Sequence, residues 1–168
     1  MRRIAFFPGS FDPITKGHED IVRRALPMFD KIIVALGVNS SKNEMFPLEQ
    51  KQNWIEKTFL DCPSVEVINY KGLTIDACKK NQAKFILRGL RNSNDYEYEK
   101  SIAMMNHAME PSIETIYLNT HPEWTAISST IVRDIIKNKT PATKTAPKAS
   151  CGEYPIPAQT PTATNALI

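Results

Sequence analysis

The sequence predicts an α/β fold with a doubly wound, Rossmann-like sheet of about five parallel strands and helices on both faces. Short runs rich in β-branched and aromatic residues alternate with segments of helical periodicity, which is typical of parallel βαβ units. The run at 31–38 (KIIVALGV) is apolar through its middle, as expected of a strand covered on both faces. A chain of 168 residues is long enough for one compact domain with a hydrophobic core.

Five strands and five helices are expected. The strands are predicted at residues 4–7, 31–38, 65–70, 85–88 and 115–119. The helices are predicted at about residues 17–26, 48–60, 74–82 and 95–109, with a last helix that begins near Ser128 or Ser129 and runs through Ile136. Two apolar stripes at helical spacing are expected to face the core, one of Trp54, Ile55, Thr58 and Phe59, the other of Tyr98, Ile102, Met105 and Met109.

The net charge of +3 is concentrated near the C-terminus. From residue 137 onward the chain holds four lysines and one glutamate, so the preceding residues are neutral in sum. A neutral body lacks the broad basic face of a nucleic-acid-binding protein. We therefore expect no nucleic-acid partner.

Cysteine usage and hydropathy predict a cytoplasmic protein without a membrane partner. Cys62, Cys78 and Cys151 are odd in number and form no CxxC pair, which argues for buried thiols and against a disulfide framework or a zinc site. The first apolar run ends at Pro8, too early for a signal peptide. No apolar run approaches the roughly 20 residues that a membrane helix needs.

The last part of the sequence has a different composition. Residues 140–168 hold 5 of the chain's 12 prolines and show neither helical nor strand periodicity. Such a Pro/Thr/Ala-rich segment is predicted to be disordered or extended. The expected organisation is a folded domain at residues 1–139 and a tail at residues 140–168.

Ligands of doubly wound sheets bind beyond the carboxyl ends of the strands. After the first predicted strand, Gly9 frees the backbone to approach a ligand, and Ser10 offers a hydroxyl group and an N–H. Gly17 and His18 open a helix, whose N-terminus favours a phosphate. Neither the GxGxxG dinucleotide fingerprint nor the GxxxxGK[ST] P-loop is present, and no metal-ligand spacing links His18 with the other histidines.

Two arginines follow the fourth predicted strand. Arg88 and Arg91 flank Gly89-Leu90 where a buried strand ends. Guanidinium groups match phosphates in bidentate geometry, so this position indicates an anion site. A structural salt bridge to Asp95, Glu97 or Glu99 is the alternative, and the sequence leaves both open.

Two further loops carry groups suited to anions. Ser128, Ser129 and Thr130 stand at the start of the last predicted helix, where one of them would suffice for an N-cap. Lys42 is the lysine of the loop after the second predicted strand, where a solvated side chain is the ordinary alternative.

These motifs together resemble the phosphopantetheine adenylyltransferases, a family of the nucleotidyltransferase superfamily marked by an (H/T)xGH motif. The matching segments are FPGSFDPITKGH (7–18), SKNEMF (41–46), ILRGLRNSNDYEYE (86–99) and EWTAISSTIVR (123–133). The resemblance runs from about residue 3 to residue 138. It implies a nucleotidyltransferase domain that transfers the adenylyl group of ATP to 4′-phosphopantetheine, giving dephospho-coenzyme A and pyrophosphate.

The resemblance also implies roles for individual residues. The residues implied in catalysis are His18, Lys42, Ser10 and Arg91. Those implied in ATP binding are Ser10, Phe11, His18, Gly89, Leu90, Arg91, Glu99, Trp124, Thr125, Ala126, Ile127, Ser128, Ser129 and Thr130. Those implied in phosphopantetheine binding are Ser10, Lys42, Thr74, Arg88, Met105 and Asn106. Members of the family use Mg²⁺, which we expect to be held mainly through ATP phosphates and water, and work as homohexamers.

The sequence departs from the family pattern at two points. Ser10 stands where threonine is commoner, and the Pro/Thr/Ala tail replaces a short acidic-aromatic stretch and a final helix.

Three alternative functions compete with the one that the resemblance implies. The first is a related nucleotidyltransferase acting on nicotinate mononucleotide or glycerol phosphate, although such relatives usually have histidine at the position of Thr15. The second is a non-catalytic nucleotide sensor, and the third is a variant with altered assembly.

Overall fold

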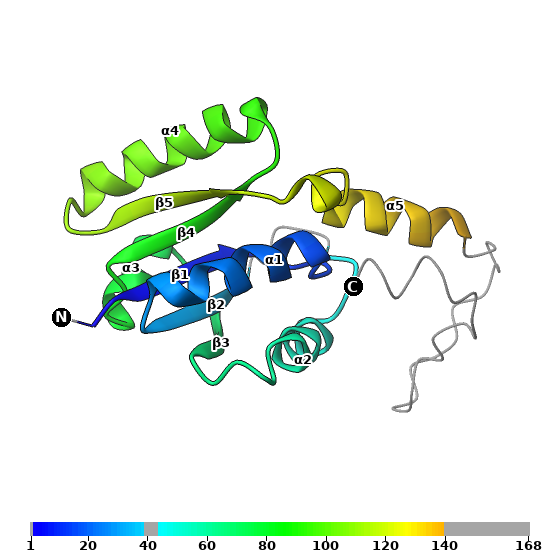
Figure 1. Ribbon diagram of the computed structural model, residues 1–168, viewed down its shortest axis with the longest axis horizontal. Helices are drawn as coiled ribbons and strands as arrows, with labels where there is room; N and C mark the ends of the chain where they lie inside the picture. The colour runs from blue at the N-terminus through cyan, green and yellow to red at the C-terminus, as the bar shows by residue number, and fades with distance from the viewer. Residues whose placement is uncertain (1, 39–43, 140–168) are drawn as a thin grey trace.

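The computed structural model describes residues 2–38 and 44–139, and these residues form the predicted α/β fold (Figure 1). The strands are β1 (Ile4–Gly9), β2 (Lys31–Gly37), β3 (Val65–Tyr70), β4 (Phe85–Leu90) and β5 (Glu114–Asn119). The helices are α1 (Lys16–Ala25), α2 (Leu48–Thr58), α3 (Thr74–Lys80), α4 (Ser93–Met109) and α5 (Ser129–Lys139). Two 3₁₀ turns that the sequence did not predict are η1 (Leu26–Met28) and η2 (Pro122–Trp124). The five-strand, five-helix prediction is therefore confirmed, with element ends shifted by a few residues.

The five strands are parallel and lie in the order β3-β2-β1-β4-β5. The chain moves outward from β1 through β2 to β3, and then returns to the other side of β1 to form β4 and β5. The strand order thus switches direction between β1 and β4, which pair through Ala5 with Phe85 and Phe6 with Ile86. In sheets of this kind the ligand site lies beyond the carboxyl ends of the strands at the switch point.

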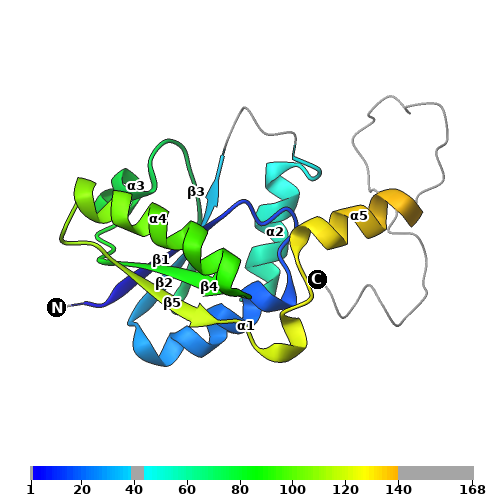
Figure 2. The same cartoon turned by 90° about the horizontal axis from the view of Figure 1, so that it is seen from above.

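Each face of the sheet is covered by helices, as the predicted doubly wound arrangement requires (Figures 1 and 2). Alternate residues of β2 point to opposite faces. Val34 belongs to the core shared with α1 and α2, whereas Ile33 belongs to the core shared with α3. α4 packs over β4 and β5 on the α3 side. The stripe predicted for α2 is confirmed, because Ile55 and Phe59 are buried in the core that α1 and α2 share with the sheet.

The apolar stripe of α4 is exposed, so the prediction that it faces the core is wrong for the described chain. Tyr98 is 69% exposed, Met105 66% and Met109 43%. α4 covers the β4–β5 edge with Asn106, which is buried, and turns the methionines toward solvent. Helical spacing shows that these residues share a side of the helix, but it does not show what that side contacts.

The last helix starts at the second of the two predicted positions. The Ser128 hydroxyl accepts a hydrogen bond from the N–H of Ile131 at 3.2 Å, so Ser128 is the cap. The Ser129 hydroxyl instead donates to the carbonyl oxygen of Pro13 at 2.8 Å. α5 is thereby fixed to the loop after β1 and extends away from the sheet (Figure 1).

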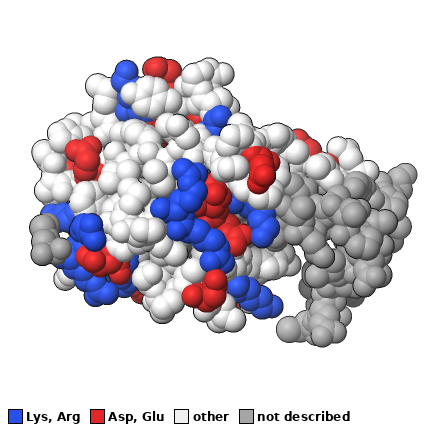
Figure 3. All heavy atoms as spheres, viewed as in Figure 1, with Lys and Arg blue, Asp and Glu red and all other residues white. Residues whose placement is uncertain are grey.

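Cys62 and Cys78 are buried free thiols, and burial raises the pKa of Cys78 to about 12. Cys151 and the tail at residues 140–168 lie outside the described residues. None of the described helices is long and apolar enough to cross a membrane. The face of the molecule seen in Figure 3 carries charges of both signs side by side. On α1, Lys16 pairs with Glu19 and Arg24 pairs with Asp20.

The packing of α2 on the sheet gives a test of the fold. Ile55 is fully buried, so Ile55→Ala should lower the free energy of unfolding by about 2–5 kcal/mol through lost burial and a residual cavity. Leu60, which follows the same helix and is 86% exposed, provides the control. Leu60→Ala should change the free energy of unfolding by less than about 0.5 kcal/mol. Urea unfolding followed by circular dichroism measures both. Equal effects of the two substitutions would contradict the packing of α2 described here.

Candidate active site

The loop between β1 and α1 has a backbone shape that depends on Gly9. Phe11 adopts a φ of +43°, a left-handed conformation that residues other than glycine rarely take. This turn brings the Phe11 ring against the backbone of Gly9, where a Cβ atom would lie 2.9 Å from the ring. Any larger residue at position 9 would therefore displace Phe11. Ser10, between them, is exposed at the end of β1.

The ring of His18 is oriented by Thr15 at the start of α1. Its Nδ1 atom accepts a hydrogen bond from the backbone N–H of Thr15 at 3.0 Å and lies 3.0 Å from the Thr15 hydroxyl oxygen. An accepting Nδ1 places the proton of the neutral ring on Nε2. Packing against Phe11, whose ring centre is 5.2 Å away, removes water from the imidazole.

His18 is held in its neutral form. Burial, reinforced by the positive charges of Arg88 and Arg91, lowers the pKa of His18 to about 4. At neutral pH the ring is therefore an uncharged Nε2–H donor with a fixed direction. Such a donor can bind a phosphate oxygen without first taking up a proton.

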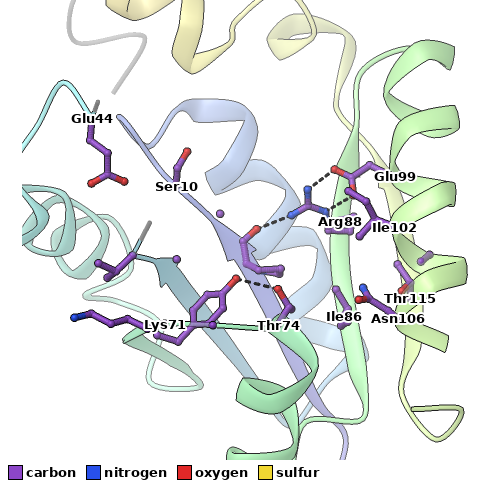
Figure 4. Close-up of a pocket in the computed structure, with 17 residues that line it drawn as sticks. Ser10, Glu44, Lys71, Thr74, Ile86, Arg88, Glu99, Ile102, Asn106 and Thr115 are labelled. Carbon is purple, nitrogen blue, oxygen red and sulfur yellow. Dashed lines mark hydrogen bonds and ion pairs between the residues drawn. The ribbon is translucent and has the colours of Figure 1, made fainter. Parts of the chain in front are cut away.

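Arg88, near the end of β4, and Arg91, just after it, both form salt bridges to α4, which was one of the two alternatives that the sequence left open. Arg88 donates from Nε to Glu99 at 2.7 Å, from Nη2 to the other Glu99 oxygen, and from Nη1 to the carbonyl oxygen of Pro8 at 2.6 Å. Arg91 pairs with Asp95 at 2.9 and 3.1 Å. Arg88 of β4 thus bonds to Pro8 of β1 across the switch point and to Glu99 of α4 (Figure 4).

Two cavities meet at this point. One has a volume of about 630 Å³ and lies between the ends of β1 and β2, α3 and α4, and the other, of about 390 Å³, lies between the β1–α1 loop, the end of β4 and the start of α5. Both volumes fall in the range of small-molecule sites. The residues that line both cavities are Pro8, Gly9, Ser10, Arg88 and Glu99. Figure 4 shows the larger cavity, with Ser10 and Arg88 on its wall.

The structure gathers most of the predicted site residues around these cavities. The predicted nucleotide residues that line the smaller cavity are Ser10, Phe11, His18, Gly89, Arg91, Glu99, Ile127, Ser128, Ser129 and Thr130. The predicted phosphopantetheine residues that line the larger cavity are Ser10, Thr74, Arg88 and Asn106.

Other predicted residues lie elsewhere. Met105 is on the exposed side of α4, about one hundred degrees around the helix from Asn106, and lines neither cavity. The residues outside both linings also include Leu90, Trp124, Thr125 and Ala126. Lys42 lies outside the described residues.

Two residues that support the site, Asp12 and Arg133, were not among those predicted from the sequence. The buried carboxylate of Asp12 accepts hydrogen bonds from the N–H groups of Met45 and Phe46 at 2.9 and 3.0 Å. Arg133 of α5 donates to the carbonyl oxygen of Asp12 and lines the smaller cavity. Arg133 ends the segment EWTAISSTIVR one turn after Thr130, and that spacing could have indicated it.

Comparison with known proteins defines the class of protein to which this fold belongs. Residues 6–135 match the cytidylyltransferase-like family. Among solved structures, a bifunctional NMN adenylyltransferase/ADP ribose pyrophosphatase from Francisella tularensis superposes with a TM-score of 0.63 at 22% identity, covering 82% of this chain and 43% of that one. A putative nicotinate-nucleotide adenylyltransferase from Vibrio parahaemolyticus superposes with a TM-score of 0.61 at 19% identity, covering 88% of this chain and 95% of that one. At these identities the likeness is one of fold.

Sequence relatives narrow the class to one family. The phosphopantetheine adenylyltransferase of Flavobacterium psychrophilum is 57% identical over 136 residues, which are 81% of this chain and 89% of the relative. Those of Cytophaga hutchinsonii and Leptospira biflexa are 50% and 43% identical over similar lengths, 82% of this chain and 91% and 86% of the relatives. The chain belongs to the phosphopantetheine adenylyltransferase family.

The environment of His18 gives a prediction about its titration. Above pH 5 the ring should be neutral with the proton on Nε2, because its pKa is lowered from 6.5 to about 4. A pKa lowered by folding means that the stability contributed by the neutral ring is present above pH 6.5 and is lost as the pH falls toward 4. Ring ¹⁵N chemical shifts, assigned with His18→Gln, report both the tautomer and the titration. A ring that titrates near pH 6.5, or carries its proton on Nδ1, would contradict this description.

Proposed function

We propose that this protein transfers the adenylyl group of ATP to 4′-phosphopantetheine, producing dephospho-coenzyme A and pyrophosphate. The observation that carries the proposal is the meeting of two cavities at Ser10 and Arg88, at the switch point of the sheet. A reaction between two bound molecules needs two sites whose reacting ends share a wall. The names of the relatives identify phosphopantetheine as the acceptor.

In the proposed arrangement, phosphopantetheine occupies the larger cavity and ATP the smaller one. The phosphate of phosphopantetheine lies at the common wall beside Ser10 and Arg88, and its pantetheine arm extends toward Thr74 and Asn106. The ATP phosphates lie along the start of α1 and the start of α5. One phosphate oxygen then attacks the α-phosphorus of ATP in line with the departing pyrophosphate.

This chemistry needs no general base. A phosphate monoester has a second pKa of about 6 and is mostly a dianion at neutral pH, so the nucleophile is already deprotonated. Catalysis then consists of positioning and of stabilising negative charge in the transition state. His18 supplies a neutral N–H for this purpose, and Ser10 orients the attacking phosphate. Arg91, together with the N-terminus of α5 at Ser128, holds the departing phosphates.

The salt bridges of the arginines are compatible with phosphate binding. A guanidinium group has five N–H donors, and the contacts of Arg88 to Glu99 and Pro8 use three of them. The two that remain suit one phosphate. Glu99 and Asp95 therefore orient the arginines before the substrates arrive, which lowers the cost of ordering them on binding.

Lys42 and Mg²⁺ complete the proposal. Lys42 is assigned to the phosphate of phosphopantetheine by the resemblance of the segment SKNEMF. Within residues 2–38 and 44–139, no three His, Cys, Asp or Glu side chains gather into a group that could hold a metal ion. The resemblance implies Mg²⁺, and we assign it to the ATP phosphates and water, where it would supply charge neutralisation.

The expected homohexamer and cytoplasmic location also remain proposals. Support for assembly comes from the exposed stripe of α4, because a row of apolar side chains such as Met105 and Met109 is typical of a surface that packs against another chain. Light scattering coupled to a sizing column should give six times the mass of one chain. The mass of a single chain would contradict the hexamer and leave the catalytic proposal to be judged by activity.

The function is tested by measuring pyrophosphate release from ATP and Mg²⁺ with different acceptors. Release with 4′-phosphopantetheine, together with dephospho-coenzyme A identified by mass spectrometry, is the expected result. Release with nicotinate mononucleotide or glycerol phosphate instead would favour another nucleotidyltransferase activity. ATP binding without release from any acceptor would favour a sensor.

The role of His18 gives a second kinetic prediction. His18→Ala removes a donor directed at developing charge, so kcat should fall on the order of 10²–10³-fold. Binding of ATP, measured by calorimetry, should weaken far less, because the contribution belongs to the transition state. His107→Ala changes an exposed histidine of α4 that lies outside the apolar stripe of that helix, so it is the matched control and should leave kcat unchanged. A kcat within a few-fold of the unmodified enzyme would show that His18 lacks this role.

A further inference from the structure

Lys51 is a charged residue buried beside the site that the mechanism above does not use. Its side chain is fully buried in the first turns of α2, although lysine is almost never fully buried without a partner. Its ammonium group donates to the carbonyl oxygen of Ser10 at 3.2 Å and lies 2.9 Å from the carboxylate of Glu44. Both partners line the larger cavity.

We propose that Lys51 is a positioning residue for adenylyl transfer. It holds the backbone of Ser10 at the junction of the two cavities, and it neutralises Glu44 on the wall of the larger one. This inference rests on the activity proposed above, and it assigns to Lys51 two effects that kinetics can separate.

The first effect is on geometry. The peptide unit that joins Ser10 to Phe11 is planar, so a carbonyl group directed at Lys51 turns the N–H of Phe11 to the opposite side. Phe11 holds the left-handed φ of +43°, which persists only where the surroundings enforce it. The ring of Phe11 is held by Gly9 and His18, and the carbonyl before it is held by Lys51. Without Lys51, one side of this peptide unit loses its anchor.

The second effect is electrostatic. Glu44 lines the cavity proposed for phosphopantetheine, on the same wall as Ser10 (Figure 4). An uncompensated carboxylate there would repel a dianionic phosphate, and the repulsion is strong where little water screens it. Lys51 pairs with Glu44 and removes this repulsion. Loss of Lys51 should therefore raise the KM for phosphopantetheine, whereas loss of both charges should not.

The test compares Lys51→Met, Lys51→Arg and Lys51→Met combined with Glu44→Gln, using the full chain. In Lys51→Met, kcat should fall about tenfold or more because Ser10 is no longer held, and the KM for phosphopantetheine should rise. In the double variant the KM should return toward that of the unmodified enzyme while kcat stays low. Lys51→Arg keeps a donor and a charge and should retain most of kcat.

A matched control separates these effects from a general loss of a lysine. Lys57 lies on the same helix with an exposed side chain, so Lys57→Met should leave both constants unchanged. Thermal unfolding of each variant shows that the protein compared is folded. If Lys51→Met alone does not fold, the double variant, which leaves no unpaired charge, carries the test of kcat.

Two results would overturn the proposal. One is a folded Lys51→Met enzyme with an unchanged kcat. The other is a double variant whose kcat recovers fully, because Lys51 would then serve only to neutralise Glu44. Either result, obtained beside an unmodified enzyme that makes dephospho-coenzyme A, refutes the role of Lys51 and leaves the proposed function intact. An unmodified enzyme that makes no dephospho-coenzyme A refutes the function itself.

Discussion

The architecture of the site depends on the contacts of the buried carboxylate of Asp12. This carboxylate accepts hydrogen bonds from the backbone N–H groups of Met45 and Phe46 and lies 3.9 Å from the guanidinium group of Arg133. One side chain therefore joins the end of β1 to the segment before α2 and to α5. A buried carboxylate without these partners would be costly, since charged groups inside proteins must be paired or hydrogen-bonded. The same contacts that satisfy Asp12 therefore fix three walls of the site relative to one another.

Two of the arginines at the site are paired with carboxylates before any ligand binds. Arg88 and Arg91 each face a carboxylate of α4, while the neighbouring imidazole of His18 stays neutral because its pKa is lowered. If His18 carried a charge, it would add a third cation to a crowded, poorly hydrated corner. As a neutral donor it contributes direction without charge. Positive charge is thus supplied by arginines with oriented donors, and hydrogen bonding by a ring whose tautomer is set by Thr15.

The sequence predicted the fold and the principal loops because those features depend on local patterns. Alternating strand and helix periodicity gave the doubly wound sheet, and glycine, hydroxyl and arginine residues after the strands indicated the cavity walls. What the sequence could not show was pairing between distant segments. Arg88 was equally compatible with an anion or with Glu99. Glu44 lies in the segment SKNEMF, but nothing in that segment indicates that it pairs with Lys51 of the next helix. Met105 and Asn106 are adjacent in sequence, yet only the packing of α4 on the sheet decides which of them faces the cavity.

The switch point also suits the electrostatics of joining two anions. Two unit charges 4 Å apart at an effective dielectric constant of about 20 repel by about 4 kcal/mol, and a dianionic phosphate approaching ATP involves more than one such pair. Positive groups are most useful where the two anions meet, which is the wall shared by both cavities. Arg88 is on that wall, and its bond to Pro8 fixes it to the end of β1. Arg91 and Arg133 line the smaller cavity and not the larger one. In the proposed reaction this position would let them hold the departing pyrophosphate without drawing the acceptor phosphate away from its line of attack.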